Sequence, residues 1–305
     1  MIRKLWIPTS HTQLLNSQHN LLKYFVDSSS TLLKSHSIEV DENGNRMNVI
    51  EARSRRKVNK SPKESRTIVM CHGLGSGLGF FFHQFKDLLR GYDRVIAVDW
   101  LGFGGSDRPV CRSAPKLREK SWIPSFCQSK LQSVEDNVNF FIDPLQKCIS
   151  KLINIEEQKY VLCGHSLGGY LTARYAIKYQ NEISRLILLS PAGLPEIPSK
   201  TIRHGDLPMA MRLIDSAWSS NVTPGQIVRT MGYRGPTLVN RIVRGRFRSL
   251  GWNEEQIRVI SEYLYHITAG MFSIFYHCFF LFILSIHSFT HPPTHPQLQD
   301  LVSFP

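Results

Sequence analysis

The sequence predicts an α/β fold, in which helices cover both faces of a parallel, doubly wound β-sheet. The first observation is a set of four short apolar segments, each followed by a glycine-containing turn. These segments are residues 67–71, 94–99, 160–163 and 186–189. Their apolar residues do not alternate with polar ones, which is typical of strands buried on both faces. The second observation is that residues 131–153 and 169–180, between these strands, have the length and apolar spacing of helices.

The composition supports a globular protein with a substantial core. The chain has 305 residues, of which 42% are hydrophobic, so it is long enough for one large domain or two small ones. Its six cysteines form no C-x-x-C pair, which argues against a disulfide scaffold and against zinc or iron–sulfur sites. We therefore expect no metal and no cofactor, and a reducing, intracellular setting.

The charge of the chain is strongly basic. Lys and Arg number 37 against 24 Asp and Glu, which gives a formal net charge of +13. Such a charge favours phosphates, acidic lipid surfaces or nucleic acid as partners, although it also serves solubility alone. The chain has no interleaved aromatic and basic motif and no nucleic-acid module, so we exclude nucleic acid. The basic stretch from Arg53 to Lys63 is interpreted as a solvated loop.

Changes in composition divide the chain into four parts. The predicted parts are an N-terminal amphipathic segment (1–35), the α/β core (36–193), a basic helical cap (194–268) and an apolar tail (269–305). The core opens with a β-hairpin whose turn is at Asn43-Gly44. The N-terminus has no apolar signal segment, and its four bases against one acid leave a mitochondrial presequence as an alternative to a cytoplasmic or membrane-associated location.

Residues 267–289 stand out because they contain no Asp, Glu, Lys or Arg. Such a stretch is long enough to span a bilayer, so we expect a transmembrane segment there. Two interpretations of the tail stay open. It is either a genuine membrane anchor or sequence foreign to the fold, such as a translated intron.

The main chemical motif is Gly164-His165-Ser166-Leu167-Gly168, a G-x-S-x-G between an apolar strand and a helix. This context is that of a nucleophile elbow, a tight strand-to-helix turn that exposes a serine hydroxyl. The glycines are needed because the neighbours two residues away must lack bulky side chains. We therefore predict Ser166 as the catalytic nucleophile.

A second motif, His72-Gly73-Leu74-Gly75, follows the first of the four apolar strands. A loop of small residues there can aim a backbone N–H at an oxyanion, so Leu74 N–H and Leu167 N–H are the predicted oxyanion hole. We expect His72 to orient this loop rather than act as a base. Asp99, which precedes the glycine-rich turn after the second strand, is interpreted as structural.

Residues 67–193 resemble an α/β-hydrolase, and the chain up to about residue 268 is similar to the lipid-metabolising α/β-hydrolase-domain group. That group includes a lipid-droplet lipase coactivator, an N-acyl-phosphatidylethanolamine lysophospholipase and a plant lysophosphatidic acid acyltransferase. The motifs that carry the resemblance are residues 6–10, 79–82, 99–106, 164–170, 221–224, 235–241 and 263–266. The coactivator has Asn where this chain has Ser166, so the chain resembles the catalytically competent branch.

The resemblance implies an α/β-hydrolase fold with a helical cap and acyl transfer through an acyl-enzyme on Ser166. The implied substrates are acyl-lipids or lysophospholipids, with acyl-CoA as a possible donor, at a membrane or lipid-droplet surface. The implied enzyme is a serine carboxylic-ester hydrolase or a lysophospholipid acyltransferase that needs no cofactor.

The tail departs from the family, which continues with two further strands that carry a catalytic Asp and a His in an H-x-x-x-x-D motif. We therefore expect a sheet that is incomplete at its C-terminal end. His295 begins an H-x-x-x-x-D match that ends at Asp300, which makes it the one candidate base, and no acid is assigned. A chain without a base retains little catalysis, so the alternative is a non-catalytic, lipid-surface-binding pseudoenzyme.

Overall fold

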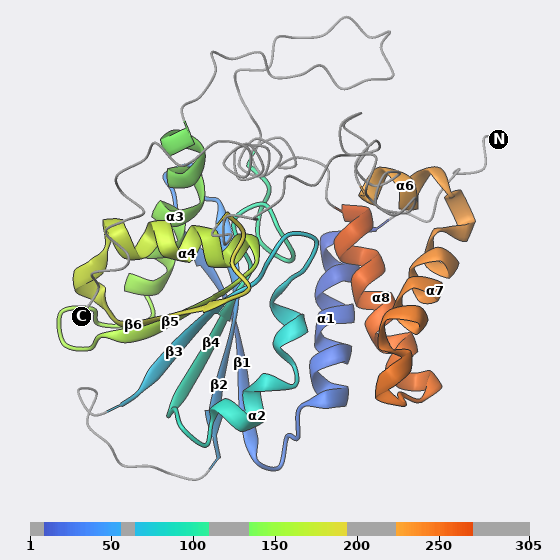
Figure 1. Ribbon diagram of the computed structural model, residues 1–305, viewed down its shortest axis with the longest axis horizontal. Coiled ribbons are helices and arrows are strands. Elements are labelled where there is room, and N and C mark those ends of the chain that lie inside the picture. The colour runs from blue at the N-terminus through green and yellow to red at the C-terminus, as the bar shows by residue number, and fades with distance from the viewer. Residues whose placement is uncertain (1–8, 56–64, 110–133, 194–223, 271–305) are drawn as a thin grey trace, which may run out of the picture.

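A computed structural model describes residues 9–55, 65–109, 134–193 and 224–270, and Figure 1 shows these as a twisted sheet between two layers of helices. In this part of the chain the sheet has six strands in the order β1-β2-β4-β3-β5-β6. The strands are β1 (Thr31–Glu39), β2 (Arg46–Ser54), β3 (Thr67–Cys71), β4 (Arg94–Val98), β5 (Tyr160–His165) and β6 (Ile183–Leu189). The last four run parallel to one another, which confirms the predicted parallel sheet.

The hairpin before the parallel strands is confirmed. Strands β1 and β2 pair antiparallel with Ile38 opposite Met47, and Gly44 has the positive φ of 78° that this turn requires. The first strand is longer than its apolar residues indicated, because it already begins at Thr31. Strand β2 then pairs antiparallel with β4 and joins the hairpin to the parallel strands.

Side chains of the central strands alternate between two hydrophobic cores. Val69 and Cys71 of β3 face one core, whereas Ile68 and Met70 face the other. Helices α3 (Val134–Ser150) and α4 (Leu167–Lys178) cover the first core. The second core lies beneath α1 (His11–Phe25), α2 (Gln84–Leu88), α6 (Pro224–Thr230), α7 (Gly235–Phe247) and α8 (Glu254–Gly270). Burial on both faces explains why the strand sequences do not alternate.

The N-terminal helix α1 is part of this architecture rather than a segment apart from it. Ser10 caps the helix by accepting a hydrogen bond from the backbone N–H of Gln13 at 3.1 Å. Leu14, Leu21 and Leu22 are buried in the second core, where α1 lies beside α8 (Figure 1). Gln18 Oε1 also accepts a hydrogen bond at 2.9 Å from the amide of Asn48 on β2.

The described part of the expected cap consists of α6, α7 and α8, and α8 lies along α1 on the same face of the sheet (Figure 1). Residues 267–270 form the last turn of α8, where Ile267 and Ala269 are buried in the second core. These first four residues of the predicted transmembrane segment thus belong to α8 and its packing on the second core. The remainder of that segment, from residue 271, lies outside the described residues. Among the helices that are described, none combines the length and the apolar character needed to cross a bilayer.

Candidate active site

Ser166 lies between the end of β5 and the start of α4, in the turn predicted as a nucleophile elbow. Its backbone has φ 54° and ψ −121°, a left-handed φ that non-glycine residues rarely adopt. Two main-chain hydrogen bonds hold this conformation, from Ser166 N–H to Leu189 O at 3.0 Å and from Ala192 N–H to Ser166 O at 2.9 Å. The turn is therefore maintained by the end of β6 and the loop that follows it, and the serine side chain stays half-exposed.

The two glycines of the motif are required by close packing. A Cβ atom on Gly164 would lie 2.2 Å from Thr172 Oγ1 and 2.4 Å from the backbone oxygen of Gly168. A Cβ atom on Gly168 would lie 2.4 Å from the backbone oxygen of His72. Gly164 is thus packed against α4, and Gly168 against the end of β3 and the residue after it, too closely for a side chain at either position.

The loop after β3 brings the second predicted motif to the serine. A Cβ atom on Gly73 would be 2.9 Å from the Cβ of Ser166, so Leu74 follows a residue in contact with the elbow. Leu167 is the first residue of α4, where backbone N–H groups have no partner within the helix. Within the described residues, no backbone carbonyl accepts a hydrogen bond from Leu74 N–H or Leu167 N–H. The role of these two donors as an oxyanion hole stays a prediction.

His72 is enclosed beneath this loop, with a relative exposure of 2%. Its Nδ1 lies 2.8 Å from the backbone oxygen of Gly73, so Nδ1 carries the proton and donates to that carbonyl. Its backbone oxygen accepts from the indole N–H of Trp100 at 2.9 Å. A buried histidine held in this way is suited to orient the loop, which is the role expected from the sequence.

Asp99 is fully buried and organises the turn after β4. Its carboxylate accepts hydrogen bonds from Leu78 N–H at 2.7 Å, Gly105 N–H at 2.8 Å and the Asn48 amide at 2.7 Å. A Cβ atom on Gly104, which has a φ of 49°, would overlap this carboxylate. Asp99 thus serves the structure, as the sequence indicated.

The structure adds a residue that the sequence analysis did not single out as functional. Tyr263 of α8 is completely buried, and its hydroxyl accepts a hydrogen bond from Gly79 N–H at 3.0 Å. A Cβ on Gly79 would lie 2.6 Å from the Tyr263 ring. The tyrosine thereby fixes the segment after the oxyanion loop from a position 184 residues away in the chain. Tyr263 is part of the motif at residues 263–266 that carries the family resemblance, but only its contact with Gly79 shows its structural role.

The predicted base, His295, lies outside the described residues, as does Asp300. Within the described ranges, no side chain is found in hydrogen-bond contact with the Ser166 hydroxyl. In the same part of the chain, no cluster of His, Cys, Asp or Glu is arranged to hold a metal ion. The described part of the site thus consists of the strained Ser166 and the loop after β3 in contact with it.

Fold and elbow together define an α/β-hydrolase, and a sequence model of the alpha/beta hydrolase fold matches residues 66–235. The chain belongs to this family. Two solved structures with TM-scores of 0.50 and 16% identity share the fold, namely the epoxide hydrolase CorEH and Cfl2 from Burkholderia cenocepacia. The comparison covers 85% and 88% of this chain, and 76% and 74% of theirs.

Relatives in sequence act on lipids. The 1-acylglycerol-3-phosphate O-acyltransferase of Arabidopsis thaliana is 32% identical over 280 residues, which is 87% of this chain and 61% of the plant protein. The 1-acylglycerol-3-phosphate O-acyltransferase ABHD5 of Mus musculus is 32% identical over 200 residues, 65% and 50% of the two chains. The (lyso)-N-acylphosphatidylethanolamine lipase of Mus musculus is 28% identical over 212 residues, 70% and 55% of the two chains. The chain thus spans less than two thirds of the length of these relatives.

Proposed function

We propose that the protein is a serine hydrolase or acyltransferase that acts on acyl-lipid or lysophospholipid esters through an acyl-enzyme on Ser166. The observation that carries the proposal is the strained, half-exposed Ser166 next to two N–H donors without a partner in the described structure. Strain of this kind costs about 1–3 kcal/mol and is typical of functional positions. The lipid substrate class is supported by the names of the relatives.

In the proposed reaction, the Ser166 oxygen attacks the ester carbonyl carbon while its proton passes to a base. The carbonyl oxygen becomes an oxyanion, which the N–H groups of Leu74 and Leu167 stabilise, and removal of one such donor typically costs about 10²–10³ in rate. The alcohol then leaves with the proton. Water or a lysophospholipid hydroxyl attacks the acyl-enzyme and releases acid or acylated lipid. His295 remains the candidate base, and acyl-CoA a candidate donor.

A basic and apolar surface on α6, α7 and the following turn supports contact with lipid. Residues 224–253 contain six arginines and no Asp or Glu. The large apolar side chains exposed there are Ile227, Met231, Tyr233, Ile242 and Leu250. Exposed apolar groups among arginines suit the interface of an anionic membrane. We place the protein inside the cell, at a membrane or lipid-droplet surface.

An activity probe tests the proposed nucleophile. A fluorophosphonate should label the wild-type chain and a Ser35→Ala control, whose serine is exposed on β1, but not Ser166→Ala. Circular dichroism must show that all three are folded. Absence of labelling in the folded wild type would show that Ser166 is not an activated nucleophile.

The second candidate function is a non-catalytic lipid-surface binder, which the same surface on α6 and α7 favours. In this case, flotation with anionic vesicles should be equal for wild type and Ser166→Ala, and the wild type should resist the probe. Flotation that is insensitive to salt would contradict the electrostatic part of this binding.

A further inference from the structure

A large basic cavity opens at the opposite edge of the sheet from Ser166. Its volume is about 1610 Å³, and its described lining includes Arg66 directly before β3, Arg94 at the start of β4 and Gln158 just before β5. Ser166 follows the carboxyl end of β5. Because β3, β4 and β5 are parallel, the cavity and the serine lie at opposite ends of the same strands, and neither belongs to the other's site.

The described lining of this cavity is rich in positive charge. Its basic residues are Arg53, Arg55, Arg66, Lys86, Arg90 and Arg94. Its acidic residues are Asp93 and Glu157. The solvated loop predicted from Arg53 to Lys63 was wrong at its start, because Arg53 belongs to β2 and pairs with Arg94 of β4. Residues 56–64 of that stretch lie outside the described residues.

Two of the six bases are used by the fold itself. Arg94 is buried and makes two hydrogen bonds of 2.9 Å to the carboxylate of Glu51, and a third of 2.8 Å to Leu152 O. Arg53 also donates to Glu51. Burial raises the pKa of Glu51, but the hydrogen bonds from Arg94 and Arg53 outweigh it and hold that pKa at about 2. This carboxylate is therefore ionised, and it also lies 3.1 Å from His36 Nε2, so its charge is used by the fold around β2.

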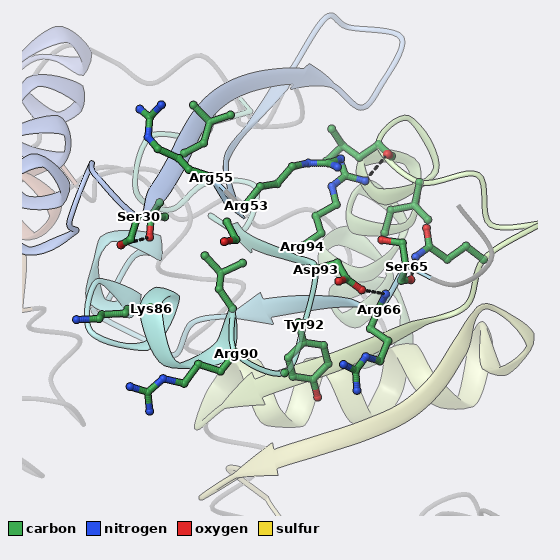
Figure 2. A pocket seen from close by; sticks show the side chains of 18 of the residues that line it. Ser30, Arg53, Arg55, Ser65, Arg66, Lys86, Arg90, Tyr92, Asp93 and Arg94 are labelled. Carbon is green, nitrogen blue, oxygen red and sulfur yellow. Dashed lines mark hydrogen bonds between the residues drawn. The ribbon is translucent and has the colours of Figure 1, made fainter. Parts of the chain in front are cut away.

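Among the described residues, the other four basic side chains have few partners for their donors. Arg55 uses only Nε, which donates to Ser28 O at 2.6 Å. Arg90 lies 3.7 Å from Asp87 in a pair so exposed that it contributes little. Arg66 and Lys86 are exposed, and no hydrogen bond from either side chain is found among the described residues. Figure 2 shows these groups on different sides of the cavity, with Arg66 near Tyr92 and Arg55 on another side.

We propose that this cavity binds a soluble anion that carries several phosphate groups. Arginine guanidinium groups match phosphate oxygens with paired, charge-assisted hydrogen bonds. A single phosphate cannot reach cations on different sides of so wide a cavity, whereas a multiply phosphorylated ligand can. A diffusible ligand is favoured over a lipid headgroup because a membrane at this edge would lie at the end of the strands away from Ser166.

Calorimetric titration of the full chain with inositol hexakisphosphate tests this site. We expect saturable binding to the wild type that weakens as salt is raised. Arg66→Gln/Arg90→Gln should weaken binding by at least about 30-fold, since each charge-assisted hydrogen bond contributes strongly. The matched control is Lys147→Gln/Arg185→Gln, which removes two exposed basic residues from α3 and β6 outside the cavity lining and should bind as the wild type does.

Three outcomes would contradict the proposal of a phosphate-binding site. They are no saturable binding at low salt, equal losses in both double variants, and binding of phosphatidylinositol bisphosphate vesicles without binding of the soluble phosphate. Inorganic phosphate should bind far more weakly than the hexakisphosphate, and equal affinity would contradict a ligand with several phosphates. Fluorophosphonate labelling should be unaffected in Arg66→Gln/Arg90→Gln. The test of the phosphate site is therefore independent of the test of Ser166 as the nucleophile.

Discussion

The two edges of the parallel sheet are built in different ways. At the carboxyl edge, Ser166 is held by main-chain hydrogen bonds and by glycines that leave no room for a Cβ atom. At the amino edge, the buried Glu51–Arg94 pair supports a wide cavity with spare positive charge. The first edge depends on backbone shape and the second on side-chain charge. Substitutions at the two edges should therefore affect different properties of the protein.

The largest effect on reactivity is expected at the carboxyl edge. Gly164→Ala places a Cβ atom against Thr172 Oγ1 and the backbone of Gly168, so the elbow must shift. A displacement of this kind should slow fluorophosphonate labelling of Ser166 by about 10²-fold. The control Gly245→Ala on α7 has no atom within 4 Å of the new Cβ and should label normally. Wild-type labelling rates in Gly164→Ala would show that the elbow tolerates displacement.

The largest effect on stability is expected at the amino edge. Glu51→Gln leaves the buried Arg94 without its counter-charge, which typically costs about 3–5 kcal/mol of unfolding free energy. Urea denaturation measures this loss, and the folded variant should still label at Ser166. The control Glu254→Gln breaks an exposed pair with Arg244 and should leave stability unchanged. Equal urea midpoints for Glu51→Gln and Glu254→Gln would show that the buried pair at the amino edge does not contribute more to stability than an exposed pair.

A smaller effect is expected from pH, through the same carboxylate. The pKa of Glu51 is about 2 in the folded protein against 4.5 ordinarily, so the unfolded chain binds its proton more readily. The stabilisation is complete above pH 4.5 and is lost as pH falls towards 2, a loss of about 3 kcal/mol. Stability curves of wild type and Glu51→Gln should converge over this interval. Parallel curves would show that Glu51 is not the titrating group.

Local patterns in the sequence predicted the parts of the fold that depend on neighbouring residues. The hairpin turn needed only Asn43-Gly44, and the elbow needed only the glycines around Ser166. The start of β1 was missed because this edge strand carries exposed polar residues such as Lys34 and Ser35, which give no apolar pattern. Edge strands often lack such a pattern because much of their surface meets water.

Long-range contacts could not be predicted in the same way. The amphipathic pattern of the N-terminal segment did not indicate its partner, which is the second core beside α8. The contact between Tyr263 and Gly79 and the pair of Glu51 with Arg94 join residues far apart in the chain. No local spacing encodes such pairs, and they become visible only when the sheet order is known. The two oxyanion donors, Leu74 and Leu167, were proposed from the local glycine-containing motifs alone, and their role stays a prediction.

The Asn48 amide gives the N-terminus a role beyond covering the sheet. Its nitrogen donates both to Gln18 on α1 and to Asp99, whose other oxygen accepts from Leu78 N–H. Deleting the first helix would therefore expose core leucines and also release an amide that helps to hold the Asp99 carboxylate in place. In shortened versions of this protein that begin at β1, we therefore expect the backbone at Leu78 to be less ordered, even where the protein is obtained in good yield.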